Sequence, residues 1–277
     1  YLEEYPAIVD KVAVTLITDQ ARIDEVLVDA RQVWEERDAR VAGMTDETVD
    51  IFYSCTLCQS YAPNHLCIIS PERLGLCGAY NWLDGKVSHE INPNGPNQPV
   101  AKGPVIDATL GTFKGINEFA YATSNKTVEE VSLYSMMNSP MTSCGCFECI
   151  MGVAPETNGV VVVNREYPEM TPLGMSFSTL AGLVGGGIQT PGFLGVGRLY
   201  LASRKFIPAD GGLERLVWMP KELKDDLREK LEKRAVDIGD PDFVDKIGDE
   251  TVATTAEELV AFLEKVGHPA LKMPSIL

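Results

Sequence analysis

The chain has 277 residues, of which 45% are hydrophobic and 23% charged, an ordinary balance for a globular protein with a substantial core. Its net charge of −16 excludes a nucleic-acid backbone or an anionic membrane as the main partner, because both would be repelled. The seven cysteines, an odd number, indicate metal binding in a reducing, cytoplasmic compartment rather than a secreted disulfide framework.

The termini and the most apolar stretch carry no membrane or export signal. Residues 175–201 are interrupted by glycines, a proline and an arginine, so they do not predict a spanning helix. The acidic start of the chain lacks the apolar segment of a signal peptide and begins with Tyr1 rather than methionine. We therefore expect a fragment or trimmed product of a longer protein.

The first predicted elements are a strand at residues 12–17, rich in β-branched side chains, and a helix at residues 21–41. Gly43 ends the helix, and the polar residues 44–49 predict a hinge. We expect an N-terminal strand–helix segment at residues 1–43 and a metal-cluster domain at residues 44–277.

Regular patterning fades at residues 55–104, and a stretch of this length needs another organising element, such as a bound metal cluster. Beyond it the pattern predicts helices and strands in alternation. The helices are expected at 127–137, 220–236 and 255–266, and the strands at 159–164, 199–203 and 215–219. We therefore expect an α/β fold, with a mixed sheet, flanking helices and a long cysteine-rich irregular segment around a metal cluster.

Four cysteines are spaced C-x2-C-x8-C-x9-C, at Cys55, Cys58, Cys67 and Cys77. Four thiolates suit either a tetrahedral zinc ion or a cubane iron–sulfur cluster. The long, unequal gaps favour the larger cluster, since zinc sites usually pair two short C-x2-C turns. Four unrelated buried thiols would be the alternative, which the close spacing disfavours.

The tripeptide Cys144-Gly145-Cys146 can offer two thiolates and two deprotonated backbone amides in one plane. Planar N2S2 geometry favours nickel(II) or copper(II) over zinc, and the sulfurs keep lone pairs that can bridge to a second metal. A redox pair or a chance loop are the other interpretations. The nearby Cys149 is predicted to be a buried core residue rather than a ligand.

Three segments closely resemble acetyl-CoA synthase, the nickel enzyme that partners carbon monoxide dehydrogenase in anaerobes. They are residues 53–78 (YSCTLCQSYAPNHLCIISPERLGLCG), 138–146 (NSPMTSCGC) and 177–193 (FSTLAGLVGGGIQTPGF). The resemblance extends over essentially the whole chain and corresponds to the C-terminal catalytic region of a longer, multidomain protein. Residues 1–43 would then be the tail of the preceding domain.

This resemblance implies that the four spaced cysteines hold a [4Fe–4S] cluster and that Cys58 also bridges to a proximal nickel. Cys144 and Cys146 would bridge that nickel to a distal nickel, which the amides of Gly145 and Cys146 complete. The proximal site would also accept copper or zinc. Tyr61 would form a wall of the proximal pocket, where a bacterial relative has phenylalanine.

The activity implied is that of an acyltransferase of the anaerobic Wood–Ljungdahl pathway. It would assemble acetyl-CoA from CO, CoA and a methyl group delivered by a corrinoid iron–sulfur protein. The family's N-terminal domain, which docks carbon monoxide dehydrogenase, has no counterpart in this chain. We therefore expect the chain to carry the cluster, to bind the dehydrogenase poorly and to have reduced or partial activity.

Two other functions remain open at this point. An iron–sulfur electron-transfer domain would use the four spaced cysteines but leaves the Cys-Gly-Cys tripeptide unexplained, and a zinc-stabilised binding module needs no planar site.

Several residues outside the cysteine motifs also have two interpretations. His65 either tunes the cluster through a hydrogen bond or is simply packed, while His89 and His268 are predicted at the surface. The glycine-rich residues 182–197 match no phosphate loop and predict close backbone packing beside the metal. The cations that follow, Arg198, Arg204 and Lys205, form a solvated face or meet a CoA phosphate.

Overall fold

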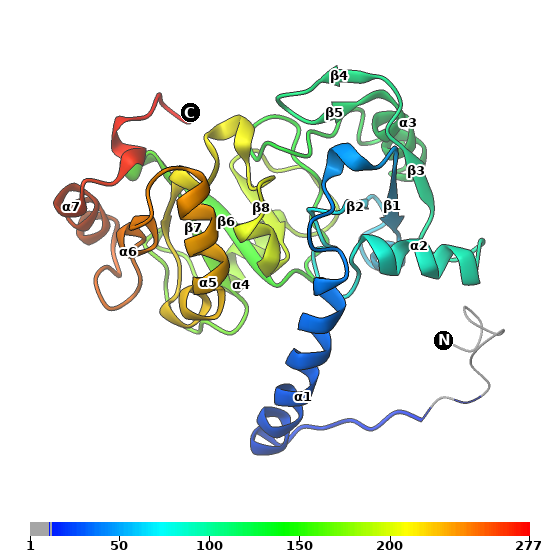
Figure 1. The fold of residues 1–277 in the computed structure, drawn as a ribbon, viewed down its shortest axis with the longest axis horizontal. Helices are drawn as coiled ribbons and strands as arrows, with labels where there is room; N and C mark the ends of the chain where they lie inside the picture. Colours follow the sequence, from blue (N-terminus) through cyan, green and yellow to red (C-terminus); the bar gives the residue numbers. More distant parts are fainter. Residues whose placement is uncertain (1–10, 12) are drawn as a thin grey trace.

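The computed structural model describes residue 11 and residues 13–277 (Figure 1). Helix α1 (Gln20–Ala39) confirms the first predicted helix, and the Asp19 side chain caps it by accepting a hydrogen bond from the Arg22 amide. The strand predicted just before it is wrong for residues 13–17, and Val12 lies outside the described residues. Val14 and Leu16 are exposed and no described strand pairs with them, so β-branched residues alone did not form a strand.

The cysteine-rich segment is more regular than expected. Strands β1 (Ile51–Cys55), β2 (Cys67–Ile69) and β3 (Pro99–Ala101) form an antiparallel sheet in the order β2-β1-β3. Helix α2 (Trp82–Ile91) packs on β1, and the Trp82 indole donates a hydrogen bond of 2.9 Å to the Ile51 carbonyl. Strands this short, separated by turns, leave too few residues for a periodic signal.

A second small sheet pairs β4 (Val105–Asp107) with β5 (Thr112–Phe113), and helix α3 (Lys114–Thr123) follows directly. The helix predicted at residues 127–137 is wrong, because this segment is an irregular loop in the structure. Its apolar residues are nevertheless buried, among them Val128, Val131 and Met136. The buried apolar residues of this loop happen to be spaced like those on one face of a helix.

The main sheet is four-stranded and mixed. Its order is β8 (Phe193–Val196), β6 (Cys149–Ala154), β7 (Gly159–Asn164) and β9 (Leu216–Trp218), with only the β7–β9 pair parallel. The predicted strands at 159–164 and 215–219 are confirmed, whereas residues 198–202 form a 3₁₀ helix (Arg198–Ala202) instead of a strand. Helix α4 (Phe177–Val184) packs against β6 and β8.

The C-terminal helices are α5 (Lys221–Asp237), α6 (Phe243–Lys246) and α7 (Ala256–Val266). Helices α5 and α7 confirm the two predicted there, including the Thr255/Glu258 capping box. They lie with the main sheet on one side of the molecule, and β1–β3, α2 and α3 lie on the other (Figure 1). The fold is mixed α/β, as predicted. None of the helices in the described residues is long and apolar enough to cross a membrane.

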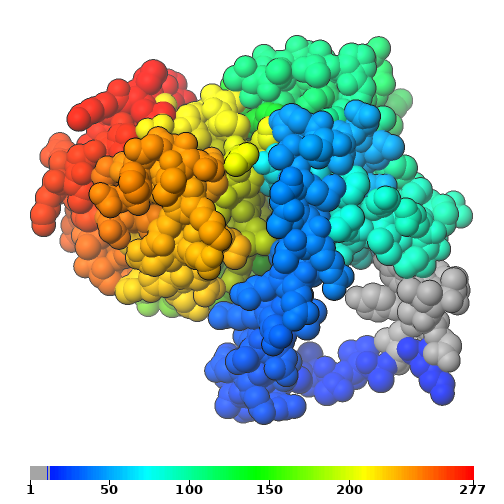
Figure 2. Space-filling model, viewed as in Figure 1, coloured from blue at the N-terminus to red at the C-terminus, as the bar shows by residue number. Residues whose placement is uncertain are grey.

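The predicted hinge at residues 44–49 is tied to the body of the protein. The Asp46 side chain is buried and accepts hydrogen bonds from the Glu72 amide at 3.1 Å and the Tyr134 hydroxyl at 3.2 Å. The Lys102 ammonium donates to the Asp46 carbonyl. Upstream of this anchor, α1 buries none of its own residues and extends from the body as a rod (Figure 2).

The expectation that His268 lies at the surface is wrong, because this ring is fully buried. Its Nδ1 accepts from the Ala270 amide at 3.2 Å, so the proton is on Nε2, which lies 3.2 Å from the Leu216 carbonyl oxygen. Burial disfavours the charged ring and lowers the pKa of His268 to about 4.

Replacing His268 by asparagine should make the free energy of unfolding less dependent on pH in acid. Between pH 6.5 and 4 the histidine of the unfolded chain is protonated, whereas the buried His268 ring stays neutral. The contribution of neutral His268 to the free energy of unfolding is therefore complete above pH 6.5 and is lost as the pH falls. In urea denaturation of the metal-free chain, H268N should lose roughly 1–3 kcal/mol less between pH 7 and pH 4.5 than the parent. The two curves should run parallel above pH 7, and equal losses on acidification would contradict this role.

Candidate metal centre

Six cysteines from two distant segments line one small cavity. They are Cys55, Cys58, Cys67, Cys77, Cys144 and Cys146, and His65 and Tyr80 complete much of the remaining wall. The cavity volume is about 20 Å³, room for about one water molecule. The structure thus gathers all six predicted cysteine ligands, although their assignment to particular metals stays a prediction.

The β1–β2 hairpin brings the first cysteines together. Cys55 ends β1 and Cys67 begins β2, and the antiparallel register makes them direct cross-strand partners. Cys58 lies between them in a short 3₁₀ helix (Leu57–Ser60). Cys77 follows in a turn where the Gly75 amide donates to the Tyr80 carbonyl and the Gly78 amide donates to the Gly75 carbonyl. The four cysteines therefore come from one hairpin, the 3₁₀ helix within it and one turn.

The Cys-Gly-Cys segment is an open loop directly before β6. Cys144 is buried and Cys146 exposed, and the Cys146 amide nitrogen lies 3.3 Å from Cys144 Sγ. The Cys146 amide therefore donates a hydrogen bond to the Cys144 sulfur, which keeps the loop closed on itself. Gly145 has φ +117°, which favours glycine, and no atom lies within 4 Å of where a Cβ would be.

Thr142 fastens this loop to the four-cysteine segment. Its hydroxyl donates to the Leu66 carbonyl at 3.1 Å and accepts from the Leu66 amide at 3.0 Å. The His65 ring lies 3.0 Å from the same hydroxyl through Nδ1, which must therefore carry the proton. Burial lowers the pKa of His65 to about 4 and keeps the ring neutral. His65 is thus a packed, hydrogen-bonded residue in the cavity wall.

The glycine-rich segment covers the loop from the other side, as predicted. The Gly187 amide donates to the Ser143 carbonyl at 2.8 Å, and the Gly195 amide donates to the Ser143 hydroxyl at 3.0 Å. A Cβ on Gly187 would approach the His65 amide nitrogen to 2.6 Å. Only glycine allows the backbone at position 187 to come this close to the backbone of residues 64–65. The same segment is hydrogen-bonded to residues 143–144, so it joins the two cysteine segments.

Glu148 joins the two cysteine segments to the main sheet. Its amide donates to the Leu76 carbonyl at 2.9 Å, and its carboxylate accepts from the Arg198 amide at 2.8 Å and lies 3.5 Å from the Arg198 guanidinium. The carboxylate lies directly over Gly78, where a Cβ would come within 2.6 Å of it. Glu148 therefore sets the position of Cys77 relative to Cys146.

The thiols of the cavity also interact directly with one another. Cys58 is hydrogen-bonded to Cys144, and this bond, together with one from Tyr61, lowers the pKa of Cys58. The pKa of Cys144 is raised by the same bond and by burial, while burial raises the pKa of Cys67. Tyr61 is half-exposed, and its hydroxyl hydrogen-bonds the thiols of Cys146 and Cys58. The residue predicted as a pocket wall thus reaches two predicted bridging sulfurs.

The donor set suits a polynuclear cluster better than a single ion. Within the described part of the chain, no three His, Cys, Asp or Glu side chains are placed to hold one metal ion. A cubane instead distributes its four thiolates around a larger body of iron and sulfide. The cavity has room for about one water molecule, so the thiols would have to turn outward to hold such a cluster. Cys58, Cys77 and Cys146, which lie at least partly at the surface, have that freedom.

Thr142, Glu148 and the contact of Gly187 with His65 could not be predicted from the sequence. No local pattern identifies these residues, because each acts on a segment remote in sequence. Cys149 is confirmed as a core residue: it begins β6, is fully buried, and has its pKa raised by that burial. Lys205, one of the three cations singled out, pairs with Glu47.

Glu148→Ala should loosen the Cys77 turn, because the ion pair and the acceptor for the Arg198 amide are both lost. In protein reconstituted with iron and sulfide, iron release to a chelator should be several-fold faster than in the parent, and Glu148→Gln should be intermediate because it keeps an acceptor. Glu156→Ala, at an exposed position in the turn after β6, is the matched control and should release iron at the parental rate. If all three variants released iron at the parental rate, Glu148 would have no role in positioning the Cys77 turn.

Comparison with known proteins adds independent information. Residues 34–277 match the family model that describes the C-terminal part of the ACS/CODH beta subunit. The carbon monoxide dehydrogenase/acetyl-CoA synthase subunit alpha of Moorella thermoacetica is 56% identical over 99% of this chain and 38% of its own length. The acetyl-CoA decarbonylase/synthase complex subunit beta of Methanopyrus kandleri is 45% identical over 98% of this chain and 56% of its own length.

A solved structure of the C-terminal domain of an acetyl-coenzyme A synthase alpha subunit is 55% identical over 49% of this chain and 100% of that one, with a TM-score of 0.46. The chain thus spans from about two fifths to just over half of the two curated relatives. The family model covers most of the chain, including every cysteine described above. The chain belongs to the C-terminal family of the ACS/CODH beta subunit.

Proposed function

We propose that residues 44–277 form the catalytic region of an acetyl-CoA synthase and that residues 1–43 are the tail of a preceding domain. The reaction would join CO, a methyl group from a corrinoid iron–sulfur protein and CoA into acetyl-CoA. The observation that carries the proposal is the convergence of Cys55–Cys77 and Cys144–Cys146 on one cavity. An electron-transfer domain or a zinc module would need only the first of these segments.

The residues present fit a nickel–nickel–[4Fe–4S] centre by their chemistry. Cys55, Cys58, Cys67 and Cys77 would hold the iron–sulfur part, and Cys144, Gly145 and Cys146 would supply a planar set of two sulfurs and two amide nitrogens. The proximal site, held by thiolates alone, would also accept copper or zinc. When bound, the centre would supply the carbon–carbon bond-forming chemistry that side chains lack.

The protein's own contribution is to position and expose the sulfurs. The lowered pKa of Cys58 favours its thiolate, which is the form that binds metal. The Tyr61 hydroxyl lies within hydrogen-bonding reach of the Cys146 and Cys58 sulfurs, and it draws charge from the sulfur to which it donates its one proton. Open space above Gly145 admits small molecules from the surface, while Thr142 and Glu148 keep the sulfurs in place from within.

The names of the relatives support a proposal for the partners and the setting. The relatives are named as subunits of carbon monoxide dehydrogenase/acetyl-CoA synthase or of decarbonylase/synthase complexes. We propose that the full-length protein works with the dehydrogenase and the corrinoid protein in an anaerobic cytoplasm. For the chain described here we expect weak binding to the dehydrogenase.

Metal analysis of three variants tests the proposal. Protein purified without oxygen and incubated with nickel should contain about four iron and two nickel per chain. Cys146→Ser should lose nickel and keep iron, whereas Cys67→Ser should lose iron. Cys149→Ala is the matched control and should keep both, because that thiol is in the core. Iron without nickel in the parent would favour electron transfer, and zinc alone would overturn the mechanism.

A further inference from the structure

Arg73 is a buried charge outside the contacts that hold the cysteine segments together. Only 2% of its surface is exposed, although arginine is almost never fully buried unless it is paired. Its Nη1 donates a hydrogen bond of 2.7 Å to the Leu133 carbonyl, while Nε and Nη2 are buried and have no hydrogen-bond partner among the described residues. The guanidinium carbon lies 4.6 Å from the centre of the Tyr200 ring, which offsets part of the cost of burial.

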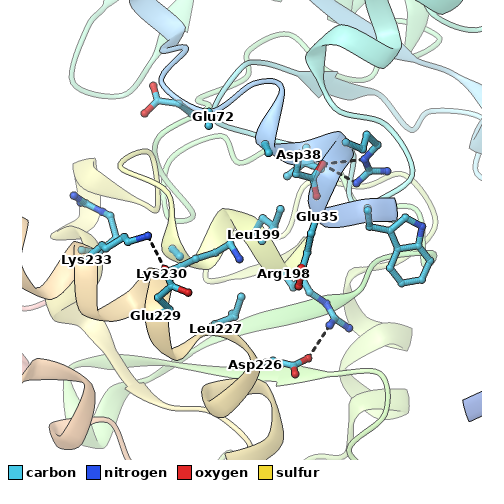
Figure 3. A pocket seen from close by; sticks show the side chains of 18 of the residues that line it. Glu35, Asp38, Glu72, Arg198, Leu199, Asp226, Leu227, Glu229, Lys230 and Lys233 are labelled. Carbon is cyan, nitrogen blue, oxygen red and sulfur yellow. Dashed lines mark hydrogen bonds and ion pairs between the residues drawn. The ribbon is translucent and has the colours of Figure 1, made fainter. Parts of the chain in front are cut away.

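No carboxylate of the described residues is paired with this charge. Glu72, the preceding residue, lines the cleft between α1 and α5, and its carboxylate accepts from the Asp46 amide at 2.9 Å (Figure 3). Arg198 in the same cleft shows the usual arrangement, since it pairs with Glu148 and with Asp226 (Figure 3). A buried cation without a negative partner is costly, and the cysteines of the metal centre are the nearby groups that become anionic.

The backbone of Arg73 belongs to the turn that joins two of these cysteines. Directly after β2, which begins with Cys67, the backbones of Ser70 and Arg73 exchange hydrogen bonds of 3.0 and 3.2 Å. Two residues further on, Gly75 lies so close to the strand that a Cβ there would be 3.9 Å from Cys67 Sγ. Gly75 also lines the cavity of the six thiols, as does Cys77. A short hydrogen-bonded turn therefore connects Arg73 to the cavity wall.

The charge of Arg73 acts on the Cys67 thiol. Burial raises the pKa of Cys67, and the neighbouring Cys55 and Cys77 raise it further because like charges repel. Arg73 lowers the pKa of Cys67 against these effects and so favours the thiolate, the form that binds metal. If all four spaced cysteines bind as thiolates, their mutual repulsion grows, and their attraction to Arg73 grows with it.

We propose that Arg73 is the internal counter-charge of the cysteine centre, a positioning residue that stabilises the bound [4Fe–4S] cluster and raises its reduction potential. The proposal rests on the proposed function, which assigns Cys67 and Cys77 to this cluster. Net charge is one of the quantities that set the potential of an iron–sulfur cluster, and a fixed cation favours the more negative, reduced form. Because Arg73 is buried, salt screens its charge much less than that of a surface arginine.

The midpoint potential of the cluster reconstituted with iron and sulfide tests this role. Arg73→Gln removes the charge and keeps a donor for the Leu133 carbonyl, whereas Arg73→Lys keeps the charge. In a dithionite titration followed by EPR, Arg73→Gln should have the lower midpoint potential. At the potential where half of the parental cluster is reduced, its reduced fraction should be several-fold smaller, and Arg73→Lys should titrate close to the parent.

Lys265→Gln is the matched control, because it removes the same charge from an exposed position on α7 that does not line the cavity. Its midpoint potential should equal that of the parent. An unchanged potential in Arg73→Gln, or equal shifts in Arg73→Gln and Arg73→Lys, would overturn the counter-charge. If Arg73→Gln alone failed to hold a cluster, the charge would be required, and failure of both variants would point to a structural role instead.

Urea denaturation of the metal-free chain provides a second test with the opposite sign. Burial raises the pKa of Cys67 and keeps its thiol neutral there, so Arg73 has no thiolate to balance it. Metal-free Arg73→Gln should therefore unfold at a higher urea concentration than metal-free Arg73→Lys, which keeps the unpaired charge. The reverse order would contradict an unpaired buried cation.

Iron content separates this inference from the proposed function. A parent that takes up no iron contradicts the proposed function and, with it, the counter-charge. A parent that takes up iron but has the same midpoint potential as Arg73→Gln contradicts the role of Arg73 alone.

Discussion

The structure depends on holding six thiols together although no covalent bond joins the two segments that carry them. Each sulfur would be a strong ligand anywhere, but a shared centre forms only if residues 55–77 and 144–146 stay in register. The Thr142 hydroxyl, the glycine-rich backbone and the Glu148 carboxylate provide that register. Each of these contacts uses neutral or charge-balanced groups, so the thiols remain the reactive element of the site.

The location of the centre follows from the same constraint. The cysteine hairpin belongs to the small sheet, and the Cys-Gly-Cys loop leads into β6 of the main sheet. The centre therefore lies where the two sheets meet, covered by backbone at the back and open at Gly145. Burial there is uneven, since Cys67 and Cys144 are enclosed while Cys77 and Cys146 reach the surface. Cys67 and Cys144 are therefore shielded from water, whereas Cys77 and Cys146 are accessible from solvent.

An element or site residue could be predicted from the sequence only where a local sequence pattern marks it. Strand β7 and helices α5 and α7 were predicted within a residue or two, because periodicity, a proline and a capping box mark them directly. The loop at 127–137 and the 3₁₀ helix at 198–202 failed, because tertiary burial imitated periodic patterns. The six clustered cysteines were readable from their spacing. Thr142 and Glu148 were not, since each acts on a segment roughly seventy residues away.

Helix α1 differs from every other long helix in burying none of its residues. Its order comes from its Asp19 cap, from side-chain pairs along its surface, and from contacts of Arg37 with the Ala79 carbonyl and with Asp84 of α2. Most of the stability of a helix in a protein comes from tertiary packing of an apolar face, which α1 lacks. Its amide hydrogens should therefore exchange with solvent far faster than those of β6 and β7, so α1 can unfold locally while the cysteine centre stays intact.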